Sequence, residues 1–186
     1  SLEALGYALE QTPVKACLVS ANYSNPTGSC MPDHRKKALV KMLAEKQIPL
    51  IEDDIYGDLS FSDTRPRAAK SFDEEGLVVL CSSFSKTLAP GYRVGWVAPG
   101  RYQREIEHQR MINTLAPASP TQMAVAEFLS SGGYERHLRK VRRIYEKQLG
   151  RMLEAVRRNF PEGTKTTHPE GSFIFWVELP AGVDSM

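Results

Sequence analysis

Four short apolar runs constrain the fold of this chain more than any other feature of its sequence. They are VKACLVSA at 14–21, IPLIEDD at 48–54, LVVLCSS at 77–83 and RVGWVAP at 93–99. Runs of this length, bounded by proline, glycine and polar residues, are typical of buried β-strands. Strands that are apolar throughout are usually covered on both faces, as in parallel βαβ units. The sequence therefore predicts an α/β fold.

Helices are predicted between and after these strands. Residues 32–47 fit an amphipathic helix, and its apolar face is expected to hold Ala38, Leu39, Met42 and Leu43. Further helices are predicted at 101–115 and at 121–130, the second stopped by Gly132 and Gly133.

A long amphipathic pattern covers residues 134–160. Its apolar positions are Leu138, Val141, Tyr145, Leu149, Met152 and Val156. We interpret the many arginines and lysines on its other side as a solvated helix face rather than a nucleic-acid surface. A helix this long is expected to leave one domain for another, and residues 171–179 are expected to begin a new sheet. The predicted domains are therefore 1–133 and 134–186.

Charge and cysteine content exclude several classes of protein. The 24 lysines and arginines nearly balance 22 acids, whereas nucleic-acid-binding surfaces usually carry a marked basic excess. Cys17, Cys30 and Cys81 form no CxxC pair, which argues against a zinc ribbon or a disulfide framework and favours a reducing, cytoplasmic location. No apolar run is long enough to cross a membrane, and no signal peptide or metal site is predicted. Because the chain starts at Ser1 and stops within GVDSM, we expect a piece of a longer protein.

Polar clusters follow three of the predicted strands. These clusters occupy residues 22–27, 52–54 and 82–86. In open α/β sheets, ligands bind just beyond the carboxyl ends of the strands. The sequence therefore predicts a ligand site that all three clusters share.

Lys86 stands in the third cluster with several hydrogen-bond donors nearby. A single lysine at a strand end usually keeps its ammonium group in water. Here Ser83, Ser85 and Arg93 supply two hydroxyls and a guanidinium, a set that suits a phosphate dianion. A desolvated lysine can instead form an imine with a carbonyl. An imine-forming lysine beside a phosphate site is the arrangement that binds pyridoxal 5'-phosphate.

The same cofactor requires a carboxylate that keeps its pyridine nitrogen protonated. Asp53, at the end of the second strand, is a candidate, although it could also be an exposed acid or the partner of a structural arginine. Tyr56 could donate a hydrogen bond to the phenolic oxygen, or it could simply be a half-buried aromatic residue. Asn25 opens an NPTG turn, in which asparagine and proline are ordinary residues.

Taken together and in order, these residues carry a family resemblance. The pieces NPTG at 25–28, EDDIYGD at 52–58 and SSFSKTLAPGYRVGW at 82–96 resemble the fold-type I pyridoxal-phosphate enzymes of the aminotransferase class I and II group. The separations also match: 53 − 25 = 28 residues from Asn25 to Asp53, and 86 − 53 = 33 from Asp53 to Lys86. The resemblance implies part of a three-layer αβα major domain and the start of a small C-terminal α+β domain.

The resemblance also implies roles for individual residues. Lys86 would hold the internal aldimine and move the substrate proton, and Asp53 would pair with the pyridinium nitrogen. Asn25 and Tyr56 would hydrogen-bond the 3-hydroxyl. The expected phosphate ligands are Ser83, Ser85 and Arg93. The family's phosphate loop and stacking aromatic residue would lie upstream of Ser1, and its carboxylate-binding arginine downstream of Met186. We therefore expect weak cofactor binding, and no efficient transamination, from these residues alone.

Within the family, residues 69–102 look most like regulators of the GntR/MocR type. In those proteins a winged helix-turn-helix binds DNA, and an aminotransferase-like domain in a homodimer senses the cofactor or an amino compound. DNA would then be bound only through an N-terminal domain absent from this chain. The alternative is a stand-alone aminotransferase of the aminoadipate or aromatic type. A third hypothesis is a doubly wound domain without cofactor, in which Lys86 and Asp53 merely pair with each other.

Overall fold

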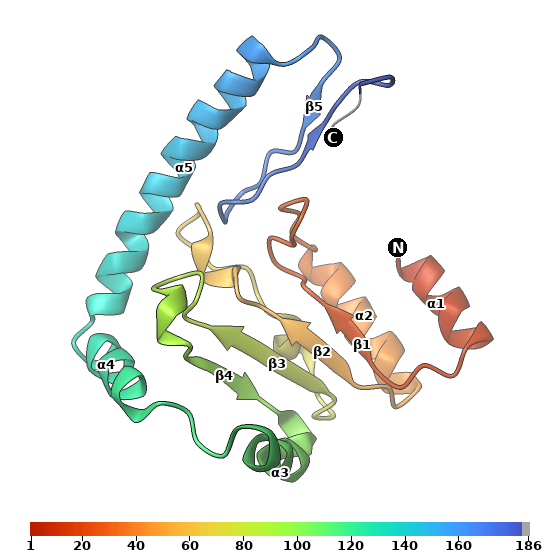
Figure 1. Cartoon of the computed structure of the whole chain (residues 1–186). Helices are drawn as coiled ribbons and strands as arrows, with labels where there is room; N and C mark the ends of the chain where they lie inside the picture. The colour runs from red at the N-terminus through yellow and green to blue at the C-terminus, as the bar shows by residue number, and fades with distance from the viewer. Residues whose placement is uncertain (184–186) are drawn as a thin grey trace.

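The computed structural model describes residues 1–183, and its centre is a four-stranded sheet (Figure 1). The strands, in spatial order, are β1 (Cys17–Val19), β2 (Leu50–Asp53), β3 (Val78–Ser83) and β4 (Gly95–Ala98). Each lies inside one of the four predicted apolar runs. The α/β fold expected from the sequence is therefore confirmed.

One pairing differs from the parallel pattern that the sequence predicts. Strands β1, β2 and β3 are parallel, but β4 runs antiparallel to β3. Only a turn and a short 3-10 helix, η3 (Pro90–Tyr92), connect β3 to β4. A parallel crossover usually needs a dozen or more residues with a helix, so this short connection brings the chain back in the opposite direction.

The helices surround the sheet and lead away from it. They are α1 (Leu2–Gln11), α2 (Asp33–Glu45), α3 (Gln103–Thr114), α4 (Ser119–Ser130) and α5 (Gly133–Asn159). The sequence did not predict α1, which the Ser1 hydroxyl caps by accepting a hydrogen bond from the Ala4 N–H at 3.2 Å. The predicted glycine stop is half right: Gly132 has a φ of +67°, but Gly133 already belongs to α5.

The main core lies between the sheet and α2. Leu39, Val40 and Leu43 of α2 are buried in one cluster with Leu50 of β2 and Val78 of β3. Ala38, predicted to share this face, is exposed, and Lys36 is fully buried instead. The Lys36 amine donates a hydrogen bond of 2.7 Å to the Arg67 carbonyl oxygen, which compensates for its burial.

The opposite face of the sheet is more open. Ile51, Val79, Cys81 and Val97 line a pocket of about 510 Å³ on this face, next to α3. Leu18 of β1 lies at the same level of the sheet as Ile51 and Val79 and is 71% exposed. No helix among residues 1–183 is both long and apolar enough to cross a membrane.

The C-terminal segment forms a second, two-stranded antiparallel sheet at the far end of α5 (Figure 1). Its strands are β5 (Lys165–Thr166) and β6 (Val177–Glu178). The new sheet expected over residues 171–179 is therefore limited to its last part. Earlier residues of that run return to the main body instead, where the Ser172 N–H donates to the Leu59 carbonyl oxygen at 2.8 Å.

Two short 3-10 helices, η1 (Gly57–Leu59) and η2 (Ala69–Phe72), lie between β2 and β3. Asp73, just after η2, fastens this connection to the start of β3. Its carboxylate accepts hydrogen bonds from the N–H groups of Leu77 and Val78, both at 3.0 Å, and from the Lys70 amine at 2.7 Å. Burial alone would raise the pKa of Asp73, but these three donors outweigh it and lower the pKa below 3.8.

We expect Asp73→Asn to lower the free energy of unfolding by about 1–3 kcal/mol at neutral pH, because buried donors lose a charged acceptor. A lowered native pKa adds stability above the unfolded pKa that is lost as the pH falls through the native one. The difference from wild type should therefore shrink below about pH 4. Urea unfolding between pH 3 and pH 7 measures this, with the exposed Asp63→Asn as control. A difference independent of pH would contradict the role of the Asp73 charge.

Candidate cofactor-binding site

The three polar clusters meet at one edge of the sheet. Strands β1, β2 and β3 are parallel and in register, with Val19 opposite Glu52 and Asp53 opposite Cys81. Their carboxyl ends therefore open on the same side (Figure 1). This is the edge at which open α/β sheets bind ligands.

The NPTG turn follows β1 and presents Asn25 at its exposed tip. A bridge between Ser24 and Ser29 closes the turn, and the Gly28 N–H donates to the Ser24 carbonyl oxygen at 2.6 Å. Gly28 has a φ of +70°, and a Cβ atom there would lie only 2.6 Å from the Ile174 carbonyl oxygen. Glycine is therefore needed at this position, both for the backbone conformation and for the close approach of residues 169–174.

Three consecutive acids at the end of β2 have three different environments. Glu52 is fully buried and accepts hydrogen bonds from the N–H groups of Ala69 at 2.7 Å and Lys70 at 2.9 Å. Asp54 is also buried, and it accepts from the Arg65 guanidinium at 2.5 Å and the Asn22 amide at 2.9 Å. Both carboxylates are thus occupied by groups of this chain.

Asp53 points to the other face of the strand and is half-buried. Among the interactions of residues 1–183, its carboxylate accepts one hydrogen bond, from the Ile55 N–H at 3.3 Å, and forms no ion pair. Burial raises the pKa of Asp53; the Ile55 N–H opposes this and the Asp54 charge adds to it. Glu52 and Asp54 already have hydrogen-bond donors as partners, and a cation placed beside Asp53 would give its carboxylate a partner as well.

Tyr56 lies three residues after Asp53 and is buried, 5% exposed. Burial raises the pKa of its phenol; the polar Asn25 side chain opposes this, and the Asp53 charge adds to it. The Phe173 ring packs edge-on against Tyr56, with ring centroids 5.8 Å apart. The structure thus brings Asn25, Asp53 and Tyr56 into one group.

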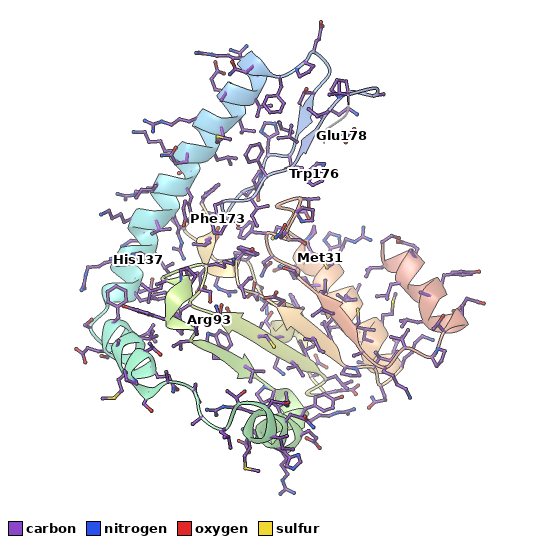
Figure 2. The ribbon with its side chains drawn as sticks, viewed as in Figure 1. Met31, Arg93, His137, Phe173, Trp176 and Glu178 are labelled. Carbon is purple, nitrogen blue, oxygen red and sulfur yellow. The ribbon has the colours of Figure 1, made fainter. Side chains whose placement is uncertain are left out.

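The turn after β3 carries the second group of predicted residues. The Ser83 hydroxyl accepts from the Ser85 N–H at 3.3 Å, and the Arg93 guanidinium donates to the Ser85 hydroxyl at 3.4 Å. Arg93 has a φ of +53°, which turns the chain just before β4 (Figure 2). Lys86 is exposed in this turn and forms no hydrogen bond or ion pair with residues 1–183.

The free Lys86 amine contradicts the third hypothesis drawn from the sequence. In that hypothesis Lys86 and Asp53 are a structural ion pair, yet within residues 1–183 neither has an ionic partner. Residues 1–183 leave Lys86 exposed to solvent, whereas an imine-forming lysine is usually desolvated. Desolvation would have to come from the cofactor or from chain outside these residues.

Sequence reasoning missed a set of side chains that surround the Lys86 turn. They are Asp58, Thr87, Tyr134, His137 and Arg142. Asp58 lies inside the EDDIYGD piece, but its partner Tyr134 is 76 positions away. A tyrosine in an amphipathic helix is usually a core residue, so the sequence offered no signal for this contact.

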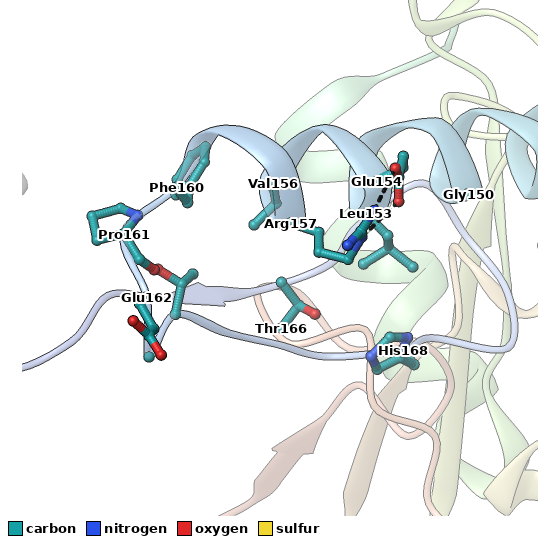
Figure 3. Close-up of a pocket in the computed structure, with 12 residues that line it drawn as sticks. Gly150, Leu153, Glu154, Val156, Arg157, Phe160, Pro161, Glu162, Thr166 and His168 are labelled. Carbon is teal, nitrogen blue, oxygen red and sulfur yellow. Dashed lines mark hydrogen bonds and ion pairs between the residues drawn. The ribbon is translucent and has the colours of Figure 1, made fainter.

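A separate pocket of about 630 Å³ lies between the C-terminal half of α5 and residues 160–168 (Figure 3). None of the predicted site residues lines it. Its charged side chains include Glu154 and Arg157, which pair with each other at 2.9 Å. This pocket therefore has no part in the candidate site.

Comparison with known proteins agrees with this geometry. The family model for aminotransferase class I and II matches residues 1–185. The chain is 45% identical, over 99% of its length, to the HTH-type transcriptional regulator YjiR of Escherichia coli, and covers 39% of that protein. It is 32% identical, over 95% of its length, to aromatic-amino-acid aminotransferase 1 of Thermococcus litoralis, and covers 42% of it.

A solved structure gives the same result for the fold. The kynurenine aminotransferase of Pyrococcus horikoshii superposes on the whole chain with a TM-score of 0.92 at 33% identity, and 47% of that enzyme is covered. The chain thus spans less than half the length of these relatives. By sequence and by fold, it belongs to the aminotransferase class I and II family.

Proposed function

We propose that this chain is part of the aminotransferase-like domain of a GntR/MocR-type transcriptional regulator, which binds pyridoxal 5'-phosphate through Lys86. The observation that carries the proposal is the pair of groups at one sheet edge. Lys86 and Asp53, an amine and a carboxylate without an ionic partner among residues 1–183, lie there with the donors Ser83, Ser85 and Arg93. The higher identity to an HTH-type regulator than to an aminotransferase favours the regulator.

The residues present fit the cofactor group by group. When bound, pyridoxal phosphate would supply an aldehyde and a ring that withdraws electrons, and Lys86 would supply the amine that holds the aldehyde. Asp53 would pair with the protonated ring nitrogen and thereby satisfy its own carboxylate. Asn25 and Tyr56 would hydrogen-bond the ring hydroxyl.

The phosphate would be held at the turn after β3. Ser83, Ser85 and Arg93 offer two hydroxyls and a guanidinium, and charge-assisted hydrogen bonds of this kind are the strong ones. The left-handed backbone at Arg93 places its side chain on Ser85. The complex of the Pyrococcus horikoshii enzyme with PMP supports the same cofactor chemistry.

The second candidate is a stand-alone aminotransferase of amino acids. The TM-score of 0.92 to a kynurenine aminotransferase favours it, because the fold of this region is that of an enzyme. In that case Lys86 would also move the proton at the substrate Cα atom. Regulator and enzyme would use the same residues at this site.

We further propose the partners and organisation of the whole protein. The regulator would be a cytoplasmic homodimer that binds an amino acid or amino compound, and would contact DNA through a separate N-terminal domain. The three cysteines, which form no disulfide among residues 1–183, support a reducing compartment. Residues 1–133 would belong to the cofactor-binding domain, whereas α5 and the β5–β6 sheet would begin the small domain.

The test uses the full-length protein. Adding pyridoxal phosphate should produce the visible absorbance band of a lysine imine, called the absorbance band below. Adding the cofactor or an amino compound should then change the affinity for DNA upstream of the protein's own gene by about fivefold or more, a common size for coupling between two sites. Absence of specific DNA binding, together with multiple-turnover production of keto acids, would favour the aminotransferase, and DNA binding that ignores both ligands would contradict the sensing role. No absorbance band at all would contradict both functions.

A further inference from the structure

The first turns of α5 lie against the turn that carries Lys86. Figure 2 shows His137 at the α4 end of this helix, beside the connection between β3 and β4. The Tyr134 ring packs edge-on against Phe84, with ring centroids 5.6 Å apart. Tyr134 is buried and sits between this turn and η1, the short helix that follows Tyr56.

The Tyr134 phenol joins these two segments through hydrogen bonds. Its oxygen lies 3.0 Å from Asp58 Oδ2 and 2.9 Å from Thr87 Oγ1. The phenol has only one proton, and a carboxylate can only accept. Tyr134 therefore donates to Asp58, and the Thr87 hydroxyl donates to Tyr134. Burial raises the pKa of Tyr134, so the phenol keeps the proton that this arrangement needs.

Two further contacts hold the backbone of the same segments. His137 Nε2 lies 2.9 Å from the Thr87 carbonyl oxygen, and because a carbonyl can only accept, this nitrogen carries the proton. Arg142 Nε donates to the Asp58 carbonyl oxygen at 2.7 Å. Arg65 completes the group by pairing with the Asp58 carboxylate at 2.6 Å.

We propose that Tyr134 is a positioning residue for Lys86, acting through Thr87 and Asp58; this rests on the proposed role of Lys86 as the cofactor lysine. Lys86 has no side-chain partner among residues 1–183, so the position of its amine depends on its backbone. Thr87, the next residue, is held by both its side chain and its carbonyl oxygen. Asp58 lies two residues after Tyr56, the predicted donor to the ring hydroxyl. By binding Asp58, Tyr134 therefore also holds the loop that carries Tyr56.

The test compares Tyr134→Phe with wild type in the full-length protein. The variant keeps the ring and loses only the hydroxyl. Thr87→Val removes the other hydroxyl, and Tyr7→Phe, at a site that is 68% exposed on α1, is the matched control. Three quantities are measured: the rate at which the absorbance band forms with pyridoxal phosphate, the pH midpoint of that band, and hydrogen exchange at the Leu88 and Ala89 amides of the protein without cofactor.

Both amides donate to the Phe84 carbonyl oxygen, and they report on how firmly the turn is held. In Tyr134→Phe we expect their exchange to accelerate about tenfold, the effect of losing one hydrogen bond to a charged group. The band should form about fivefold more slowly, with its pH midpoint moved by about half a unit. Adding Thr87→Val to Tyr134→Phe should change little more, because both variants break the same contact.

Two results would overturn the proposal. If Tyr134→Phe lowers only the melting temperature and leaves band formation and its pH midpoint as in wild type, Tyr134 is a structural residue alone. If exchange at Leu88 and Ala89 matches that of Tyr7→Phe, Tyr134 does not hold the turn. Failure of the proposed function looks different: wild type itself then forms no band, while the exchange measurement still decides whether Tyr134 holds the Lys86 turn.

Discussion

Replacing Lys86 by alanine should abolish the visible absorbance band of the full-length protein with pyridoxal phosphate completely. The band would arise from a covalent bond between the Lys86 amine and the cofactor's aldehyde, and alanine has no amine to form it. The other lysines of the described region cannot substitute for Lys86, because none of them follows β3 beside Ser83, Ser85 and Arg93. Cofactor held only by its phosphate should keep the spectrum of the free aldehyde.

Lys41→Ala is the matched control for this experiment. Lys41 is exposed on α2 and forms a surface ion pair with Glu45, so its loss should leave the band unchanged. Reduction of the mixture with borohydride, followed by peptide mapping, locates the modified lysine directly. A band of normal intensity in Lys86→Ala, or a modified peptide elsewhere in the chain, would show that Lys86 has been assigned wrongly.

The second large effect is expected for Asp53→Asn. This variant keeps the shape of the side chain but removes the charge that would pair with the protonated ring nitrogen. The covalent bond to Lys86 should still form. Removal of the proton from the amino acid Cα should slow by at least about a hundredfold, because breaking a buried ion pair costs about 3–5 kcal/mol.

Exchange of the Cα proton with deuterated solvent measures this step in the full-length protein, and it applies to a sensor as well as to an enzyme. Asp63→Asn is the control, because Asp63 is an exposed acid in a loop. Normal Cα exchange in Asp53→Asn would mean that another group protonates the ring. The prediction for Asp53 would then be wrong even if Lys86 binds the cofactor.

The strands and most helices could be predicted from the sequence because their patterns are local. The second and third apolar runs end within one residue of the ends of β2 and β3. The periodicity of residues 134–160 likewise matches α5 to within one residue at each end. What the sequence could not give is the direction of β4 and the burial of Lys36. Both depend on contacts with distant segments: β4 on a short connection, and Lys36 on the Arg67 carbonyl oxygen.

In the candidate site, too, some residues could be predicted from local patterns and others could not. Asn25, Asp53 and Lys86 stand at strand ends, where a sequence pattern is informative. The sequence alone places Glu52 and Asp54 on the opposite face of the strand from Asp53, because side chains alternate along a strand. It did not show that Arg65 and two backbone N–H groups would occupy those acids, since these partners come from the irregular connection between β2 and β3.

Helix α5 is a continuous element between the turn that carries Lys86 and the second sheet. It is one unbroken helix of 27 residues, and at 1.5 Å per residue it is about 40 Å long. One end lies at Thr87, next to Lys86, and the other leads to β5 and β6 (Figure 1). The same continuous helix therefore connects the turn that carries Lys86 with the start of the second sheet.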